Sequence, residues 1–270
     1  MFVIRWFLSV VDSVSGRLSG NASKSSVKRG VWLTLGMFAA VSLVWGQSPQ
    51  SANSGEEKSV EESYLQDSIE LAIIHEQSRS ENWDGQMVAL EYIAEAINKG
   101  NTGDEIRVAL EYMGLEGIAN IMRENGRIVN NFPDIRARAA GYLGELGTTE
   151  AKDALIKMLL ADNEPWVLSE AVKSLAKIGI NDDEETVRTI AWIIRRYDTI
   201  GPNDILAKSA LEAFDTFAQN NNGIKDYSTV QAIMRIRDGR YIRPVKEKAK
   251  QVLANIRKYS QNDSSKQQRQ

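Results

Sequence analysis

The feature that most constrains this chain is an apolar pattern that returns every 32 to 39 residues. Ala139, Leu143 and Leu146 stand at positions i, i+4 and i+7, which lie on one face of a helix. The same spacing returns in three later sets and in one earlier set: Ala171/Leu175/Ile178, Ala210/Phe214/Phe217, Ala249/Leu253/Ile256 and Ala89/Ile93/Ala96. From Ala139 onward the alanines are 32, 39 and 39 residues apart. This period predicts a row of helical units, each of which buries its apolar face on the next.

The most regular copy contains Pro133-Asp-Ile-Arg, then Ala139-Ala140, and ends in Leu143-Gly-Glu-Leu-Gly147. It resembles a HEAT repeat, in particular the PBS-lyase HEAT-like subclass, and a second copy runs from Pro165 to Gly179. The resemblance extends over roughly residues 84–258 and implies a helical solenoid. Because HEAT arrays mostly hold other proteins, it also implies a binding role.

The predicted fold class is therefore all-α, an α-solenoid of about five HEAT-like helix pairs. We expect the repeat domain at residues 60–258, after a flexible polar linker at 47–59 and before a disordered Gln- and Ser-rich tail at 259–270. Prolines 133, 165, 202 and 244 lie where the first helices should begin.

Three local patterns predict helix positions in more detail. The helix at 60–80 is expected to turn its regular apolar stripe inward, that is Leu65, Ile69, Ala72 and Ile73. Thr102 and Glu105 form a capping box, which predicts a helix from there to about Arg123. Ser228 and Gln231 form a second capping box.

The N-terminal 46 residues indicate export. Lys28 and Arg29 precede an uncharged run at residues 30–45, and Gly46 is followed by a polar stretch, which is the pattern of a signal peptide cleaved after Gly46. An uncleaved anchor remains an alternative, with residues 30–45 as a membrane tether. Sequencing the mature N-terminus distinguishes the two, since cleavage leaves Gln47 first. We expect a periplasmic or cell-envelope protein; whether residues 1–27 are translated stays open.

Composition excludes several functions. The chain has no cysteine, so thiol catalysis, Cys-based metal sites and lipidation at a signal cleavage site are excluded. Residues 1–46 hold five of the 33 cations and one of the 36 anions, leaving 28 cations against 35 anions in the remainder. Such an acidic body has no general attraction for nucleic acid.

No catalytic residues, metal ligands or cofactor are expected. His75 is the only histidine, which rules out a His cluster, and no nucleotide-binding glycine motif is present. Carboxylates on predicted helices are interpreted as solvated faces: Glu91, Glu95, Glu111, Glu116, Glu145 and Glu170. A carboxylate enzyme working in the solenoid groove is kept as an alternative of another class.

One surface is the candidate binding site. On the predicted helix 184–198, the spacing of the apolar residues Val187, Ile190, Ala191 and Ile194 places them on the buried face. The arginines and the tryptophan of this helix then lie on another face. Second helices of a solenoid are expected to line its inner side. The candidate partner-binding residues are Arg188, Trp192, Arg195, Arg196, Arg235 and Arg237. An acidic protein segment or an anionic envelope polymer is the expected partner, although helix-end arginines and a tryptophan packed between repeats would explain the same residues.

The sequence therefore predicts a non-enzymatic protein-binding scaffold or adaptor in the cell envelope. A membrane-anchored assembly or regulatory factor is the alternative if the apolar run is retained.

Overall fold

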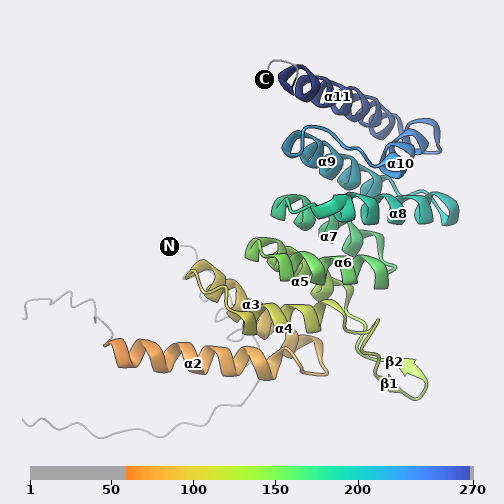
Figure 1. Ribbon diagram of the computed structural model, residues 1–270. Helices are drawn as coiled ribbons and strands as arrows, with labels where there is room; N and C mark the ends of the chain where they lie inside the picture. Colours follow the sequence, from red (N-terminus) through yellow and green to blue (C-terminus); the bar gives the residue numbers. More distant parts are fainter. Residues whose placement is uncertain (1–58, 268–270) are drawn as a thin grey trace, which may run out of the picture. The chain divides into compact units, whose positions relative to one another are not determined.

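The computed structural model describes residues 59–267, which form a row of stacked helices (Figure 1). Ten α-helices and one short hairpin make up this part, and they confirm the predicted all-α solenoid. The elements in chain order are α2 (Val60–Gln77), α3 (Trp83–Asn98), α4 (Asp104–Gly114), β1 (Arg123–Glu124), β2 (Arg127–Ile128), α5 (Pro133–Leu146), α6 (Thr149–Ala161), α7 (Pro165–Ile178), the 3₁₀ turn η2 (Asp182–Glu184), α8 (Glu185–Ile200), α9 (Asp204–Asn220), α10 (Tyr227–Asp238) and α11 (Arg243–Gln267).

The helices form two rows. The first helices α3, α5, α7, α9 and α11 pack side by side, and the second helices α4, α6, α8 and α10 form the other row. Between the rows, α4 packs on α5, α6 on α7, α8 on α9 and α10 on α11, while α2 packs on α3 at one end. From α5 to α11, neighbouring first helices pack more extensively on one another than the second helices do.

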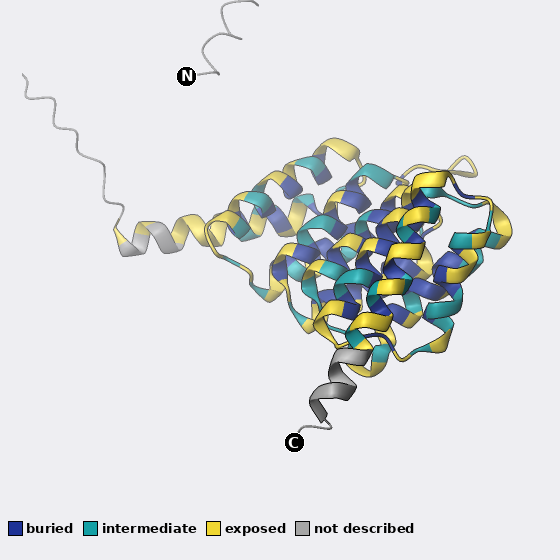
Figure 2. Cartoon of the chain, turned by 90° about the horizontal axis from the view of Figure 1, so that it is seen from above, coloured by how far each residue is buried: buried dark blue, intermediate teal, exposed yellow. Residues whose placement is uncertain are grey.

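The repeated apolar sets supply the core between the rows. Ala139, Leu143, Ala171 and Leu175 are all buried, as predicted, and the buried positions face neighbouring helices (Figure 2). Close packing of the first helices depends on small side chains, because a Cβ added to Gly144 of α5 would lie 2.7 Å from the Ser174 Cβ of α7.

Most helices begin and end near the prolines and glycines that the sequence analysis assigned to their ends. Pro133 and Pro165 occupy the first position of α5 and α7, where no N–H is needed. Gly147 and Gly179 end these helices in the left-handed conformation, with φ of 70° and 75°. The capping box at residue 228 is wrong, since the Asp226 carboxylate accepts from the Thr229 N–H at 2.7 Å and caps α10.

Helix α2 is turned over relative to its prediction. Leu65 and Ile69 are exposed, whereas Glu70 and Ile74 are buried against the array. On this inward face, the Lys99 Nζ at the end of α3 lies 3.0 Å from the Glu70 carboxylate. The two regular apolar residues thus point to the side that nothing in the described chain covers.

The predicted helix from 102 to about 123 ends early. The N-cap of α4 is Gly103, without a side-chain cap, and the helix stops at Gly114. Gly117 then turns the chain with φ of +75°, and residues 123–128 form a two-stranded antiparallel hairpin. This hairpin projects from the row of helices (Figure 1).

Two predicted segments lie at the ends. Residues 1–46 and most of the 47–59 linker are outside the described residues. At the other end, where a disordered tail is predicted from residue 259, α11 continues to Gln267, and Tyr259 packs against the core.

Candidate functional site

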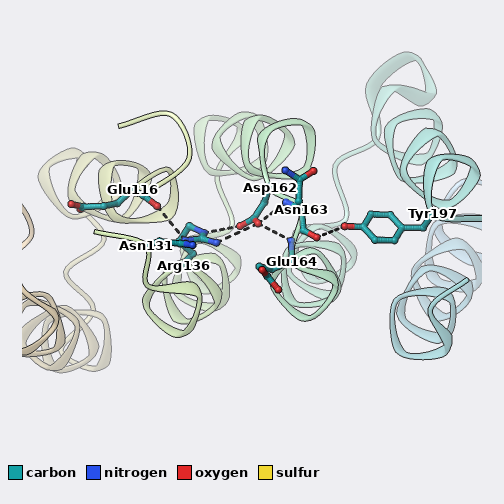
Figure 3. Close-up of polar contacts among 7 residues, drawn as sticks. All are labelled: Glu116, Asn131, Arg136, Asp162, Asn163, Glu164 and Tyr197. Atoms are coloured by element: carbon teal, nitrogen blue, oxygen red, sulfur yellow. Dashed lines mark hydrogen bonds and ion pairs between the residues drawn. The ribbon is translucent and has the colours of Figure 1, made fainter. Parts of the chain in front are cut away.

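A buried ion pair fixes the central repeats to one another. The Arg136 Nε on α5 donates to the Asp162 Oδ2 in the α6–α7 turn at 2.7 Å, and both side chains are almost fully buried (Figure 3). The other Asp162 oxygen accepts the backbone N–H groups of Asn163 and Glu164 at 2.6 and 2.9 Å. The pair therefore determines where α5 lies relative to the start of α7.

The polar contacts continue to both neighbours of this pair. The Arg136 Nη1 donates to the backbone oxygen of Glu116 at 3.2 Å and to the Asn131 Oδ1 at 2.7 Å. On the other side, the Tyr197 hydroxyl of α8 donates to the Asn163 backbone oxygen (Figure 3). The loop after α4, helix α5, the α6–α7 turn and α8 are linked in one chain of contacts.

Glu116 is buried, contrary to the prediction of a solvated helix face. Its two carboxylate oxygens accept from the Gln86 Nε2 at 2.6 Å and from the Asn130 Nδ2 at 3.1 Å. Burial raises the pKa of Glu116; these two hydrogen bonds act in the opposite direction, and the Glu81 charge adds to the increase. The carboxylate holds the hairpin segment against α3.

This shift predicts a pH-dependent stability. Because the folded-state pKa of Glu116 lies above its ordinary value, the folded state binds more protons between those two values, and its contribution to stability falls as pH rises through that window. We expect wild type to lose stability relative to the Glu116→Gln variant as pH rises across this window, because the glutamine does not titrate. Urea unfolding at a series of pH values measures it. A difference that stays constant would contradict the shift.

A second feature, on the outside of the array, is a row of exposed apolar side chains at the starts of the first helices. Trp83, Trp166, Ile205 and Ile242 lie at or next to the first residue of α3, α7, α9 and α11, and are between 41% and 65% exposed. On α5 the matching position is Asp134, whose Oδ2 accepts from the Trp83 Nε1 at 2.5 Å. The row therefore runs over the neighbouring helices α7, α9 and α11, and Asp134 on α5 separates it from Trp83 on α3.

Two grooves of about 550 Å³ each accompany this row. The first lies between α5 and α7, where the small residues Ala137, Gly141 and Ser174 leave room beside Trp166. The second crosses α7, α9 and α11, with Ile205 and Ile242 in its lining. Lys173 lines both grooves, so they adjoin on one surface, which we call the first-helix face.

Charged side chains of both signs line the grooves: the cations are Arg138, Lys173, Lys177, Lys208 and Lys248, and the carboxylates are Asp134, Glu145, Glu170, Asp204 and Glu212. Arg138 of α5 lines the first groove, Lys173 lines both, and Lys208 and Lys248 of α9 and α11 line the second. These residues follow the apolar row by one or two helical turns. The first-helix face therefore combines exposed apolar side chains with charges of both signs.

Comparison with known families agrees with this architecture. A family model described as HEAT repeats matches residues 127–214, from β2 to the middle of α9. Residues 127–214 of this chain are therefore HEAT repeats. Curated proteins gave no match, nor did solved structures. HEAT repeats are typical of protein-interaction scaffolds, in which each unit contacts its neighbours and leaves an extended surface for a partner.

The predicted arginine face lies on the other row of helices, α8 and α10. Arg188 lies near the start of α8, where its Nε is 3.8 Å from the Asp226 carboxylate. Arg235 near the end of α10 is 3.7 Å from the Asp198 carboxylate of α8. Two of the predicted residues thus link α8 to α10, at opposite ends of the helices.

The remaining predicted residues lie near the end of the same helices. Arg196 stacks near the half-exposed Trp192 ring, with its guanidinium carbon 5.8 Å from the ring centre, and donates to the Asn163 side chain. Arg195 is partly buried, and Arg237 pairs with the neighbouring Asp238 at 2.6 Å. The structure does not gather the six residues in one place, and their role in binding stays a prediction.

The sequence analysis did not predict the first-helix face, because its residues do not belong to the apolar i, i+4, i+7 sets that mark the buried side of each helix. Of the four exposed apolar residues, Trp166 alone directly follows a helix-start proline, so the row has no common local signal in the sequence. Its exposure depends on how far the next helix reaches, which periodicity does not give.

Neither a metal-ligand cluster nor a membrane-spanning helix occurs among the described residues. Within residues 59–267, no group of three or more His, Cys, Asp or Glu side chains is placed to hold a metal ion. The helices of that same range include none that is long and apolar enough to span a bilayer. The apolar run at 30–45 lies outside the described residues.

Proposed function

We propose that this protein is a non-enzymatic scaffold or adaptor of the cell envelope that holds a protein partner on its first-helix face. The observation that carries the proposal is the exposed apolar row beside the two grooves. Isolated apolar residues are common on protein surfaces, but here they recur at the same repeat position next to hollows.

The residues of the face fit protein binding better than chemistry. Tryptophan is enriched among residues that contribute most to binding energy, and Trp166 stands half-exposed at the edge of a groove. The groove carboxylates Glu145 and Glu170 each pair with a lysine, Lys177 and Lys173 respectively. Such surface ion pairs are weak, so charged groups of a partner can replace them. The envelope location is proposed from residues 28–46 of the sequence.

The proposal predicts that truncating the apolar row weakens partner capture. A Trp166→Ala/Ile205→Ser variant should reduce crosslinked partner by about tenfold or more, since each hot-spot residue contributes about 2 kcal/mol. The measurement is quantitative crosslinking and purification from the native envelope fraction. Urea unfolding of both proteins checks that the fold is retained.

A matched control comes from the other row of helices. Ile200 of α8 and Tyr227 of α10 are also strongly exposed but line neither groove. An Ile200→Ser/Tyr227→Ser variant should capture the partner as well as wild type. Equal capture by all three proteins would reject the first-helix face as the binding surface.

A further inference from the structure

We propose that copies of this chain associate head to tail, with the α2 end of one row of helices docked on the α11 end of the next. The proposal concerns the two ends of the row and does not depend on the first-helix face. It rests on the opposite charges of the two ends and on an apolar stripe that the α2 end leaves exposed.

The two ends of the row carry opposite charge. Helix α2 packs on α3 and α4 at one end, and α11 packs on α9 and α10 at the other (Figure 1). Residues 60–99, which include α2 and α3, hold nine Asp and Glu against two Lys and Arg, a net charge of −7 with histidine neutral. Residues 227–260, which include α10 and most of α11, hold nine Lys and Arg against two Asp and Glu, a net charge of +7. Since these counts include both signs, each end as a whole attracts the other.

The two cations of the acidic end are already engaged. Lys99 pairs with Glu70 and Glu95 at 3.0 and 2.9 Å. The guanidinium carbon of Arg79 lies 5.5 Å from the centre of the Tyr112 ring. The exposed carboxylates of this end that form no ion pair within the described residues are Glu62, Asp67, Glu76, Glu81, Asp84 and Glu91.

The two carboxylates of the basic end are engaged as well. The Asp238 carboxylate lies 2.6 Å from the Arg237 guanidinium. The Glu247 carboxylate lies 3.0 Å from the Lys250 Nζ. Among the described residues, the exposed cations of this end without an ion pair are Arg240, Arg243, Arg257 and Lys258. Each end therefore presents charges of one sign to a neighbouring copy.

The α2 end also leaves apolar side chains uncovered. Leu65, Ile69 and Ala72 follow the spacing of one helix face, and the first two are 64% and 55% exposed. The terminal unit of a solenoid normally turns a polar face to water. At the basic end, Met234 is 40% exposed, Ala254 is exposed, and the aliphatic stems of the lysines add apolar surface. A second copy would cover the α2 stripe with this surface.

The order of the helices allows the row to continue across the contact. Helix α2 packs on α4 and begins the row of second helices, whereas α11 packs on α9 and ends the row of first helices. In a stacked copy, α2 and α3 would follow α10 and α11, as α4 and α5 follow α2 and α3. The docked copies would thus repeat the kind of contact that already joins neighbouring units.

Other pairings of the ends bring like charges together. Two α2 ends would oppose carboxylates to carboxylates, and two α11 ends would oppose cations to cations, which is unfavourable. A head-to-tail contact uses a different patch on each copy, so it repeats from copy to copy into an open chain or a closed ring.

Cysteine crosslinking tests the arrangement, because the chain has no cysteine of its own. Ala72 and Ala254 are small and exposed, so Ala72→Cys/Ala254→Cys marks both ends without removing a charge or a large apolar residue. Treated with a bismaleimide, the full chain with both cysteines should give a ladder of multimers on a denaturing gel. A mixture of the two single variants should give dimers, and each single variant alone should not. Dimers from Ala72→Cys alone would show contact between two α2 ends and overturn the proposal, as would the absence of a ladder.

Charge reversal assigns the ladder to the two ends. In the two-cysteine chain, Glu62→Lys/Glu76→Lys at the acidic end should reduce the multimers about tenfold or more, and so should Arg257→Glu/Lys258→Glu at the basic end. An equimolar mixture of these two proteins should restore the ladder, because each reversed end then meets an end of opposite charge. A ladder that survives either reversal, or that the mixture does not restore, contradicts head-to-tail association.

A matched control lies on the hairpin. Arg123→Glu/Arg127→Glu changes two exposed cations and alters the net charge as much as the basic-end variant does. This variant should give the same ladder as the two-cysteine chain. An equal loss of multimers in both would mean that net charge, rather than the α11 end, controls the association and would reject the proposal.

Discussion

Replacing Asp162 by alanine is expected to lower the free energy of unfolding by about 3–5 kcal/mol. The substitution leaves the Arg136 guanidinium buried without its counter-charge, and an uncompensated buried charge is among the largest single destabilisations known. It also removes the acceptor of the Asn163 and Glu164 N–H groups at the start of α7. Urea unfolding of the purified protein measures the effect.

An exposed pair provides the control for this prediction. Glu170 and Lys173 of α7 are 3.0 Å apart at the surface, and Glu170→Ala should cost about 1 kcal/mol or less. Asp162→Asn should fall between the two, because it keeps an acceptor for the turn but loses the charge. If Asp162→Ala destabilises no more than Glu170→Ala, the buried pair does not hold the repeats together.

Replacing Gly117 by alanine is expected to destabilise the protein by about 2–5 kcal/mol. With φ of +75°, the left-handed conformation alone costs a side-chain-bearing residue about 1–2 kcal/mol. The new Cβ would lie 2.6 Å from the Asn130 backbone oxygen and from the Asn131 Cα, so the backbone itself has to move. Unfolding by urea, with circular dichroism as the probe, gives the change.

Gly126 separates the two causes. It has φ of +81° in the β1–β2 turn, and no atom lies within 4 Å of an added Cβ. Gly126→Ala should therefore show the conformational cost of about 1–2 kcal/mol and nothing more. Equal losses at both glycines would mean that the contact between the loop after α4 and the hairpin segment is not tight.

The sequence predicted the core of this array well because the core is periodic. Ala210, Phe214 and Phe217 are fully buried on α9, as their i, i+4, i+7 spacing indicates. The inward set of α8 is likewise buried, from Val187 to Ile194. Each helix in the middle of the row must bury one apolar stripe on its neighbours. The apolar spacing in the sequence is therefore enough to predict which residues are buried.

At the end of the row the same rule fails. Helix α2 has neighbours on one side, and a single ion pair between Glu70 and Lys99 accompanies the burial of Ile74 rather than of Leu65 and Ile69. An end helix can turn either of two faces inward with similar apolar burial. Specific polar contacts then decide, and these join residues 29 positions apart.

The candidate binding residues were likewise predictable only in part. The sequence showed that this part of the chain carries arginine and tryptophan, and the predicted residues on α8 and α10 are at least partly exposed, but it did not show which of them come together. The exposed row of Trp166, Ile205 and Ile242 depends on helices from three repeats lying side by side. No window of the sequence contains that arrangement.

The sequence by itself determined the all-α solenoid, its repeat positions and its buried faces, because these depend on spacing within one or two helices. The tertiary structure decided the inward face of α2, the burial of Glu116 and the location of the grooves. Each of these depends on contacts between residues far apart in the chain, where one charge or one small side chain selects between packings of similar apolar area.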